Sequence, residues 1–402
     1  MLDLDLNFVM GTLPDSLQSL TSLEHLHMGS AGLTGTLPSW IGTFSNLGSL
    51  NLGYNVLHGT IPPEILTLPM LRELALDHNA FEGDVNGLFS SGGLTSLQEL
   101  FLDSNTFIGE LGDGFASNMV NLVQLDLSDN AFGGPIPEHL FSFPKLEVLD
   151  LHDNAFTSLP SSIPNNTALT FFAAQKNGLV GNIDEISNLP KLTHLDLSQN
   201  QLTGSIPESL GETVVGLTYL FLAENNFTAG PIPFSLSNLF QLKELSLKST
   251  ARTGSIPNIL GMMTELVFLD LDNNSLVGQI PATMGGLTNL HLLLLNRNNL
   301  TNEIPSQFSR LTNLQTLFLE GNNFSGGLNY TCNSILDPLA EAEIIAQCSL
   351  CDTVPGCCSQ CCDEGEACNT KTHVADLDPI WQLGYQRQDY MDYTLDKENM
   401  WR

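Results

Sequence analysis

Leucines and other apolar residues return along most of the chain in one fixed phrase. The stretch from Leu266 to Pro281 shows it clearly, and its periodic positions read LxxLxLxxNxLxGxIP. Aligning the copies on the asparagine places this position at residues 7, 31, 55, 79, 105, 130, 154, 177, 200, 225, 250, 274, 298 and 322. The thirteen steps cover 315 residues, which gives a mean period of about 24 residues. Repeats of this length predict a solenoid, in which each repeat forms one coil stacked on the last.

Strand alternation divides the positions of the phrase between core and solvent. The leucines of LxxLxL are expected to point inward, and the residues between them to face outward, because successive side chains of a strand point to opposite faces. Twelve of the fourteen aligned positions are asparagine, and the exceptions are Ala31 and Thr250. A buried amide can both donate and accept hydrogen bonds, so this column is predicted to pair with backbone groups and to be structural.

The phrase resembles the plant-type subclass of the leucine-rich repeat family. That subclass carries LxGxIP after the asparagine, as in Leu57 to Pro62, Leu202 to Pro207 and Leu276 to Pro281. The resemblance implies an α/β solenoid, a right-handed curved superhelix with a parallel β-sheet on its concave face. We expect this domain over residues 1–331, with about fourteen repeats. Because the chain opens inside a repeat, we expect the usual polar N-terminal cap to be missing.

Composition and motifs limit the function. The chain has 44 acidic and 13 basic residues, a net charge of −31, which disfavours nucleic acid and anionic lipid as partners. No apolar run approaches the roughly 18–20 residues that span a bilayer, so membrane attachment is expected only through sequence upstream of Met1. Phosphate-binding glycine loops and the HExxH, GxSxG and kinase motifs are absent from the sequence. We predict no enzyme, no catalytic residue and no cofactor.

Two zones stand out among the residues expected on the concave face. The first is acidic, with Asp129, Asp153, His152 and His194 beside the residues proposed as polar selectors, Asp126, Asp150 and Asp196. Asp126 and Asp150 are expected to be direct neighbours on adjacent strands. Three readings of this zone are open: solvated aspartates of the common LDLSxN phrase, contacts to a basic peptide or a cation, and a catalytic carboxylate pair, which an open sheet without a water-excluding pocket disfavours. The second zone is apolar and is proposed to supply ligand-binding anchors: Tyr219, Phe221, Phe268, Leu292, Leu294 and Phe318. Ring stacking along the sheet, or cover by the C-terminal tail, would also explain these residues.

One repeat departs strongly from the phrase. It has Thr250 at the asparagine position and Arg252 where a core leucine is expected. An arginine at this position is expected either to extend its charged end to the surface or to pair with a carboxylate.

The repeats stop after Leu328, and all of the cysteines follow. Asp337-Pro338 and the apolar residues after it predict a short capping helix that includes Ile344 and Ile345. We assign residues 332–368 to a disulfide-bonded cap and residues 369–402 to an acidic, aromatic tail. Disulfides are favoured over a zinc site, which the two CxxC pairs would also allow. The tail resembles those of leucine-rich repeat proteins of stramenopile algae, including diatoms. The cysteines assigned to the cap are Cys332, Cys348, Cys351, Cys357, Cys358, Cys361, Cys362 and Cys368.

Sequons and clustered cysteines together indicate an extracellular setting, either secreted or on the outer face of the plasma membrane. The predicted N-glycosylation sites are Asn165, Asn226, Asn273, Asn299, Asn323 and Asn329. The leading hypothesis is a recognition module, the ectodomain of a receptor-like or secreted protein that binds a protein, peptide or glycan, with a co-receptor for signalling. A secreted inhibitor of carbohydrate-active enzymes and a structural cell-wall or adhesion protein are the alternatives.

Overall fold

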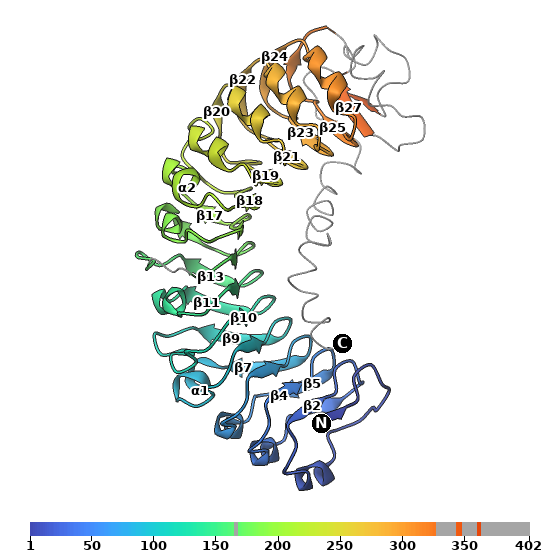
Figure 1. Ribbon diagram of the computed structural model, residues 1–402, viewed down its shortest axis with the longest axis vertical. Helices are drawn as coiled ribbons and strands as arrows, with labels where there is room; N and C mark the ends of the chain where they lie inside the picture. The colour runs from blue at the N-terminus through green and yellow to red at the C-terminus, as the bar shows by residue number, and fades with distance from the viewer. Residues whose placement is uncertain (165–167, 327–342, 348–359, 363–402) are drawn as a thin grey trace.

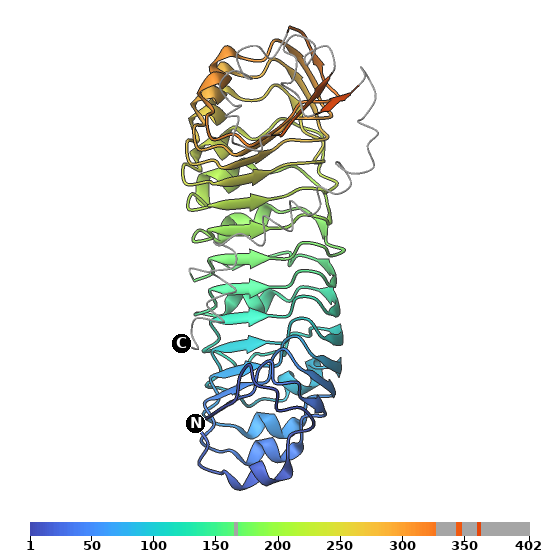
Figure 2. The same cartoon turned by 90° about the vertical axis from the view of Figure 1, so that its right-hand side faces the viewer.

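The computed structural model describes residues 1–164, 168–326, 343–347 and 360–362 of the 402-residue chain. These residues form the predicted solenoid, an arc of stacked coils with a parallel sheet along its inner side and short helical turns along its outer side (Figure 1). Figure 2 looks onto the concave side, where the strands follow one another in chain order. None of the helices within the described ranges is long and apolar enough to cross a membrane.

The concave sheet has sixteen strands, and each neighbouring pair is parallel. Each of the fourteen repeats contributes one short strand from its LxxLxL segment, and β27 and β28 follow the last repeat. The strands, in their order in the sheet, are β1 (Leu2–Asp3), β2 (His25–His27), β4 (Ser49–Asn51), β6 (Glu73–Ala75), β8 (Glu99–Phe101), β10 (Gln124–Asp126), β12 (Val148–Asp150), β14 (Phe171–Ala173), β16 (His194–Asp196), β18 (Tyr219–Phe221), β19 (Glu244–Ser246), β21 (Phe268–Asp270), β23 (Leu292–Leu294), β25 (Thr316–Phe318), β27 (Glu343–Gln347) and β28 (Gln360–Cys362).

Two smaller sheets lie on the flank of the solenoid that follows the asparagine position. One contains β3 (Thr34–Gly35), β5 (Val56–Gly59), β7 (Ala80–Asp84), β9 (Thr106–Glu110), β11 (Ala131–Pro135), β13 (Ala155–Ser158), β15 (Val180–Gly181) and β17 (Gln201–Leu202). The other contains β20 (Thr253–Gly254), β22 (Ser275–Gly278), β24 (Asn299–Asn302) and β26 (Asn323–Phe324).

The outer side carries one short helical turn in most repeats. Proline precedes many of these turns, and its extended conformation ends the strand-like segment before the turn. In the described part of the chain, the α-helices are α1 (Asn86–Ser90) and α2 (Glu208–Thr213); the 3-10 helices are η1 (Asp15–Ser19), η2 (Ser39–Thr43), η3 (Pro63–Thr67), η4 (Glu138–Ser142), η5 (Asp184–Asn188), η6 (Phe234–Asn238), η7 (Asn258–Met262), η8 (Ala282–Gly286) and η9 (Ser306–Arg310).

The asparagine column is structural, as predicted. Asn79 accepts a hydrogen bond from the Leu57 amide at 2.9 Å and donates to the carbonyls of Leu52, Leu76 and Asp77 at 3.0–3.1 Å. The residue before each aligned position has a left-handed φ, between 49° and 68° in all fourteen repeats. The chain therefore turns sharply after each concave strand, and the amide satisfies the backbone groups that this turn exposes.

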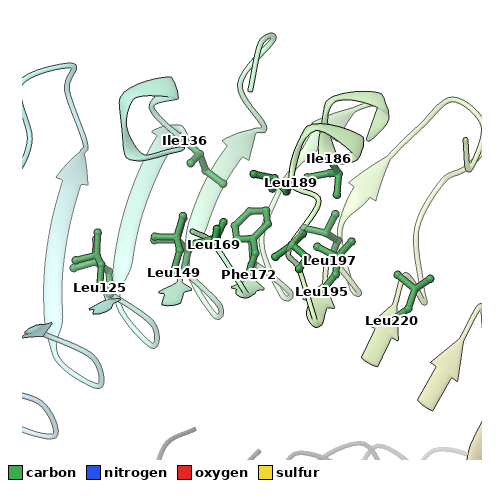
Figure 3. Packing of buried hydrophobic residues seen from close by; sticks show 14 of the residues in the cluster. Leu125, Ile136, Leu149, Leu169, Phe172, Ile186, Leu189, Leu195, Leu197 and Leu220 are labelled. Atoms are coloured by element: carbon green, nitrogen blue, oxygen red, sulfur yellow. The ribbon is translucent and has the colours of Figure 1, made fainter. Parts of the chain in front are cut away.

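The core is one continuous hydrophobic cluster that runs the length of the described solenoid. Figure 3 shows leucines of successive concave strands stacked in rows, among them Leu125, Leu149, Leu195 and Leu220. Each of these four side chains is fully buried. Neighbouring coils therefore bury one another's apolar faces, which is how a solenoid acquires a core without long-range contacts.

Arg252 contradicts the expectation of a surface-directed or carboxylate-paired arginine. The residue is only 2% exposed, and its guanidinium donates to the carbonyls of Thr250, Thr228 and Pro231 at 2.6–3.2 Å. The segment around Thr228 lies between the two flank sheets, where no strand joins β17 to β20. Backbone carbonyls at this gap have no partner strand, and the guanidinium of Arg252 donates to them instead. These hydrogen bonds offset the free-energy cost of burying the charged group.

The predicted capping helix is also wrong for the part that the structure describes. Ile344 and Ile345 lie in β27, which pairs with β25 in register with Leu317 and Phe318. A last strand leaves unpaired backbone groups along its edge, and β27 satisfies those of β25 by extending the sheet. Cys361 and Cys362 lie in β28, the next strand; the other six cysteines, most of the predicted cap and the whole tail lie outside the described residues.

Candidate functional site

The candidate site is the concave face, which carries the residues of each strand that point away from the leucine core. The predicted apolar anchors come together here as one cluster of Phe221, Phe268, Leu292, Leu294 and Phe318, with Tyr219 packed against it. Parallel register places Phe268 opposite Leu292, and Leu294 opposite Phe318. We call these six residues the apolar section.

The apolar section differs from the expectation in its exposure. Its five cluster residues are between 1% and 8% exposed, and Tyr219 alone is partly exposed. Neighbouring strands are only about 4.8 Å apart, so large side chains at equivalent positions contact each other and remove each other's surface from water. These residues form the floor of the face, and Tyr219 is the member that an approaching molecule can touch.

Polar residues of one repeat interrupt the apolar section. Glu244 and Ser246 of β19 lie between β18 and β21. Ser246 donates to Asp270 at 3.1 Å, and Lys248 forms an ion pair with Glu224 at 2.7 Å. Burial raises the pKa of Asp270 to about 7, an effect increased by Asp272 and opposed by its hydrogen bonds.

Aromatic stacking extends the apolar section toward the N-terminus, through two residues that were not among the predicted anchors. The rings of Phe171 and His194 are stacked with centroids 4.5 Å apart, and His194 lies 5.0 Å from Tyr219. Burial lowers the pKa of His194 to about 3, so this ring is neutral. Both residues occupy the position immediately before the LxL triplet, as Tyr219 and Phe268 do, and that shared position was the signal in the sequence.

The acidic zone is divided in two by the structure. Asp126 and Asp150 are direct neighbours in the register of β10 and β12. Asp196 lies two strands further along, separated from Asp150 by Ala173 and adjacent to Phe221. We call the residues around Asp126 and Asp150, with Asp129, His152 and Asp153, the acidic section.

A histidine holds the acidic section together. The Nδ1 atom of His152 lies 2.7 Å from Asp150 Oδ1, and its Nε2 atom lies 3.7 Å from Asp129 Oδ2. Burial opposes a charged ring, but Asp150, Asp126 and Asp129 outweigh it and raise the pKa of His152 to about 10. The section therefore carries an imidazolium among its carboxylates, and its most exposed groups are Asp129 and Asp153, with 49% and 45% of their side chains exposed.

Asp196 lies apart from this group and makes no ion pair with it within the described residues, although the charges of His152 and Asp150 still act on it. It is fully buried, and its Oδ1 atom accepts hydrogen bonds from the amide and hydroxyl of Ser198 at 2.8 and 2.6 Å. Burial raises the pKa of Asp196 to about 7 against the opposing effect of these bonds. Its place beside Phe221 assigns it to the apolar section's border and not to the acidic section.

Two other groups of side chains could offer three metal ligands each, within 4.8 Å of one another: Asp3, Asp5 and His27, and Asp77, His78 and Asp103. In the second group, His78 Nδ1 lies 3.4 Å from a carboxylate oxygen of each aspartate, so the ring contacts both carboxylates directly. We assign no metal site to either group.

Four predicted glycosylation sites lie in the described part of the chain. Asn226, Asn273, Asn299 and Asn323 are all exposed. Asn165 and Asn329 lie outside the described residues. Attachment of an oligosaccharide at any of the six asparagines remains a prediction.

Comparison with known proteins gives consistent results. Family models described as leucine rich repeat match residues 95–156, 191–212 and 265–287. Receptor-like protein 39 of Arabidopsis thaliana is 36% identical over 133 residues, which cover 32% of this chain and only 15% of that protein. The chain therefore spans a small part of the receptor-like proteins that it matches.

Solved structures resemble the solenoid over most of its length. The plant peptide hormone receptor RGFR1, in complex with RGF2, is 29% identical with a TM-score of 0.73, and the match covers 85% of this chain and 58% of that one. The Arabidopsis receptor kinase HAESA, in complex with the peptide hormone IDA and the co-receptor SERK1, is 26% identical with a TM-score of 0.55, over 85% of this chain and 69% of that one.

Proposed function

We propose that this chain, a leucine-rich repeat protein of the plant type, is an extracellular recognition module that binds a peptide or protein on its concave face. The observation that carries the proposal is the concave sheet itself, on which the acidic section and the apolar section lie along one continuous surface. Because neighbouring strands already fix these side chains, binding would require little ordering of the scaffold.

A peptide is the ligand class that the comparisons support best. RGFR1 and HAESA, two similar solved structures, are described as complexes with RGF2 and with the peptide hormone IDA. The spacing of the two sections fits an extended chain: β12 and β21 are five strands apart, about 24 Å, which roughly seven extended residues would span. A basic residue at one end and apolar residues toward the other would match the acidic and apolar sections.

Exposure divides the proposed roles among the residues. Asp129, Asp153 and Tyr219 are accessible enough to make first contacts. Phe221 and Phe268 shape the floor beneath the ligand. The HAESA complex also contains the co-receptor SERK1, and we propose a co-receptor as a second protein partner for this chain.

The proposal includes no catalytic step. Asp126 and Asp196 each accept a 2.6 Å hydrogen bond from the serine hydroxyl two residues further on, and Asp150 pairs with His152. Each predicted polar selector is thus oriented by its own turn or by a neighbouring side chain. Asp126 and Asp150 are 8% and 4% exposed, so they would select a basic ligand group by charge from beneath the more exposed Asp129 and Asp153, whereas the fully buried Asp196 would not touch the ligand.

The test is peptide selection followed by mutation of the floor. A displayed peptide library is selected on the folded chain, and the affinity of a selected peptide is measured by calorimetry. The variant Phe221→Ala/Phe268→Ala should weaken binding roughly tenfold or more, because buried aromatic residues dominate interface energies. The matched control is Phe234→Ala/Phe240→Ala, which removes two phenylalanines exposed by 65% and 62% away from the concave strands.

Circular dichroism and thermal melts must show that both double variants remain folded, since the floor residues are buried. Equal affinity of the folded floor variant and the folded control variant for the selected peptide would contradict the assignment of the site. Failure to select any peptide that competes for the concave face would contradict the proposed function.

A further inference from the structure

We propose that Asn226, Asn299 and Asn323 carry N-linked oligosaccharides in one row along the flank that follows the asparagine column, so that partners reach the apolar section from the opposite edge. The inference rests on the proposed extracellular function, because the oligosaccharide is transferred in the secretory pathway. It adds two features that the binding proposal alone does not require: the modification itself, and a flank of the solenoid that the oligosaccharides close to partners.

The repeat phrase explains why these three asparagines face outward. Each follows an asparagine of the ladder column directly, and each sequon has a buried residue at its centre: Phe227, Leu300 and Phe324 are between 0% and 7% exposed. In extended backbone, the residues on either side of an inward-pointing side chain point outward. The apolar centre of each sequon therefore directs both the acceptor asparagine and the hydroxyl residue to solvent.

The side chains of the three acceptor asparagines also take no part in holding the fold together. Asn226, Asn299 and Asn323 are exposed, and no hydrogen bond joins their side chains to other residues within the described part of the chain. The preceding ladder asparagines behave oppositely: Asn322 is 3% exposed, and its amide donates to the carbonyls of Leu295 and Leu319. No ladder asparagine begins a sequon, because the position two residues later is an apolar core position.

Asn273 does not belong to the row. It precedes the ladder residue Asn274 instead of following one, and its amide donates to the Ser249 hydroxyl at 2.8 Å. The row is therefore defined by repeat position and not by the mere presence of a sequon.

The row lies on the repeats that hold the apolar section. Asn226 follows β18, while Asn299 and Asn323 begin the flank strands β24 and β26 of the coils that carry β23 and β25. Asn299 pairs in register with Val277, and Asn323 with Thr301, so the last two glycans would stand on adjacent coils. Bulky oligosaccharides there would cover this flank, whereas within the described residues no sequon falls at the edge where the concave strands begin.

The first test is site occupancy. The whole chain is secreted from cultured eukaryotic cells behind a cleavable signal peptide and is then treated with peptide N-glycosidase in ¹⁸O-water, which marks each glycosylated asparagine as heavy aspartate. We expect heavy aspartate at all three positions, and loss of one glycan mass with each of N226Q, N299Q and N323Q at unchanged melting temperature. Unmodified asparagine at two or more of the three positions in secreted, folded chain would overturn the inference.

The second test measures shielding, with a matched pair of reporters. Val277 and Ile108 are 44% and 53% exposed and occupy the same repeat position; Val277 pairs with Asn299, whereas Ile108 pairs with Ala131. Hydroxyl-radical labelling of Val277 should increase after enzymatic deglycosylation, and labelling of Ile108 should not change. Equal labelling of Val277 before and after deglycosylation would overturn the closed edge.

These outcomes are separate from those of the binding test. A secreted chain without glycans that still binds its selected peptide on the concave face would refute only the glycan row. A glycosylated chain whose folded floor variant binds as well as the control would refute only the binding site.

Discussion

The acidic and apolar sections of the concave face are built on the same backbone phrase but are held in opposite ways. In the acidic section, one histidine lies among three aspartates, so charge pairing stabilises the section around the buried Asp126 and Asp150, and its exposed carboxylates are Asp129 and Asp153. In the apolar section, five side chains exclude water from one another. The repeat therefore fixes where side chains stand, while the identity of neighbours on adjacent strands decides whether a buried position is held by charge pairing or by apolar contact.

The largest expected change in stability comes from exchanging residue types between the two sections. Phe221→Asp places a carboxylate in the buried floor beside Asp196, and should cost at least about 3 kcal/mol of unfolding free energy. Asp126→Phe removes a buried carboxylate that accepts hydrogen bonds from Ser128, but its ring gains contact with Phe101 on the adjacent strand, so it should cost less, on the order of 1 kcal/mol.

Chemical denaturation of both variants checks the prediction, and each variant serves as the other's control. Similar losses in the two variants would show that the sections are not held differently. A larger loss for Asp126→Phe would reverse the comparison.

Removing the cation of the acidic section should have the next largest effect. The pKa of His152 is raised to about 10 from an ordinary value of about 6.5, so its stabilisation is complete below pH 6.5 and is lost as the pH rises toward 10. His152→Gln should therefore cost on the order of 2 kcal/mol at pH 6 and progressively less toward pH 10.

Denaturation curves of this variant and the wild type at pH 6, 8 and 10 test the prediction. His58→Gln, at an exposed position, is the control and should change stability little at each pH. A stability difference for His152→Gln that stays constant across this range would exclude the charged form of the ring as its cause.

The period and the alternation of the sequence predicted the coil, the concave sheet and the contacts between equivalent positions. Asp126 opposite Asp150 and Phe268 opposite Leu292 follow directly, because each repeat adds one strand in register. Burial could not be predicted in this way, since it depends on the size of the side chains on the neighbouring strands, as the floor residues show.

Residues that break the phrase were the least predictable. Arg252 is satisfied by backbone carbonyls of the preceding coil, and that coil's irregular path is not visible in the hydrophobic pattern. The strand at Glu343–Gln347 was mistaken for a helix because local signals at Asp337-Pro338 favoured one, whereas the free edge of β25 is a tertiary feature. Local preference yields where a sheet edge offers backbone partners.

The smallest expected effect is a difference between the two sections in the pH range over which each loses stability. Burial raises the pKa of Asp196 to about 7 from its ordinary value near 3.8, so its contribution to stability is complete below pH 3.8 and is lost as the pH rises through 7. The charges that act on it are His152, which lowers the pKa, and Asp150, which raises it. Asp196→Asn does not titrate, so it should match the wild type at pH 4 and exceed its stability by on the order of 1 kcal/mol at pH 8.

Thermal melts at pH 4, 6 and 8 would show this crossover, with the exposed Asp153→Asn as a control that should lack it. The border of the apolar section would then lose stability between pH 4 and 7, and the acidic section between pH 6.5 and 10. If Asp196→Asn were less stable than the wild type at pH 8, the carboxylate would have to be ionised and stabilised by a positive group, and Asp196 would belong with the acidic section after all.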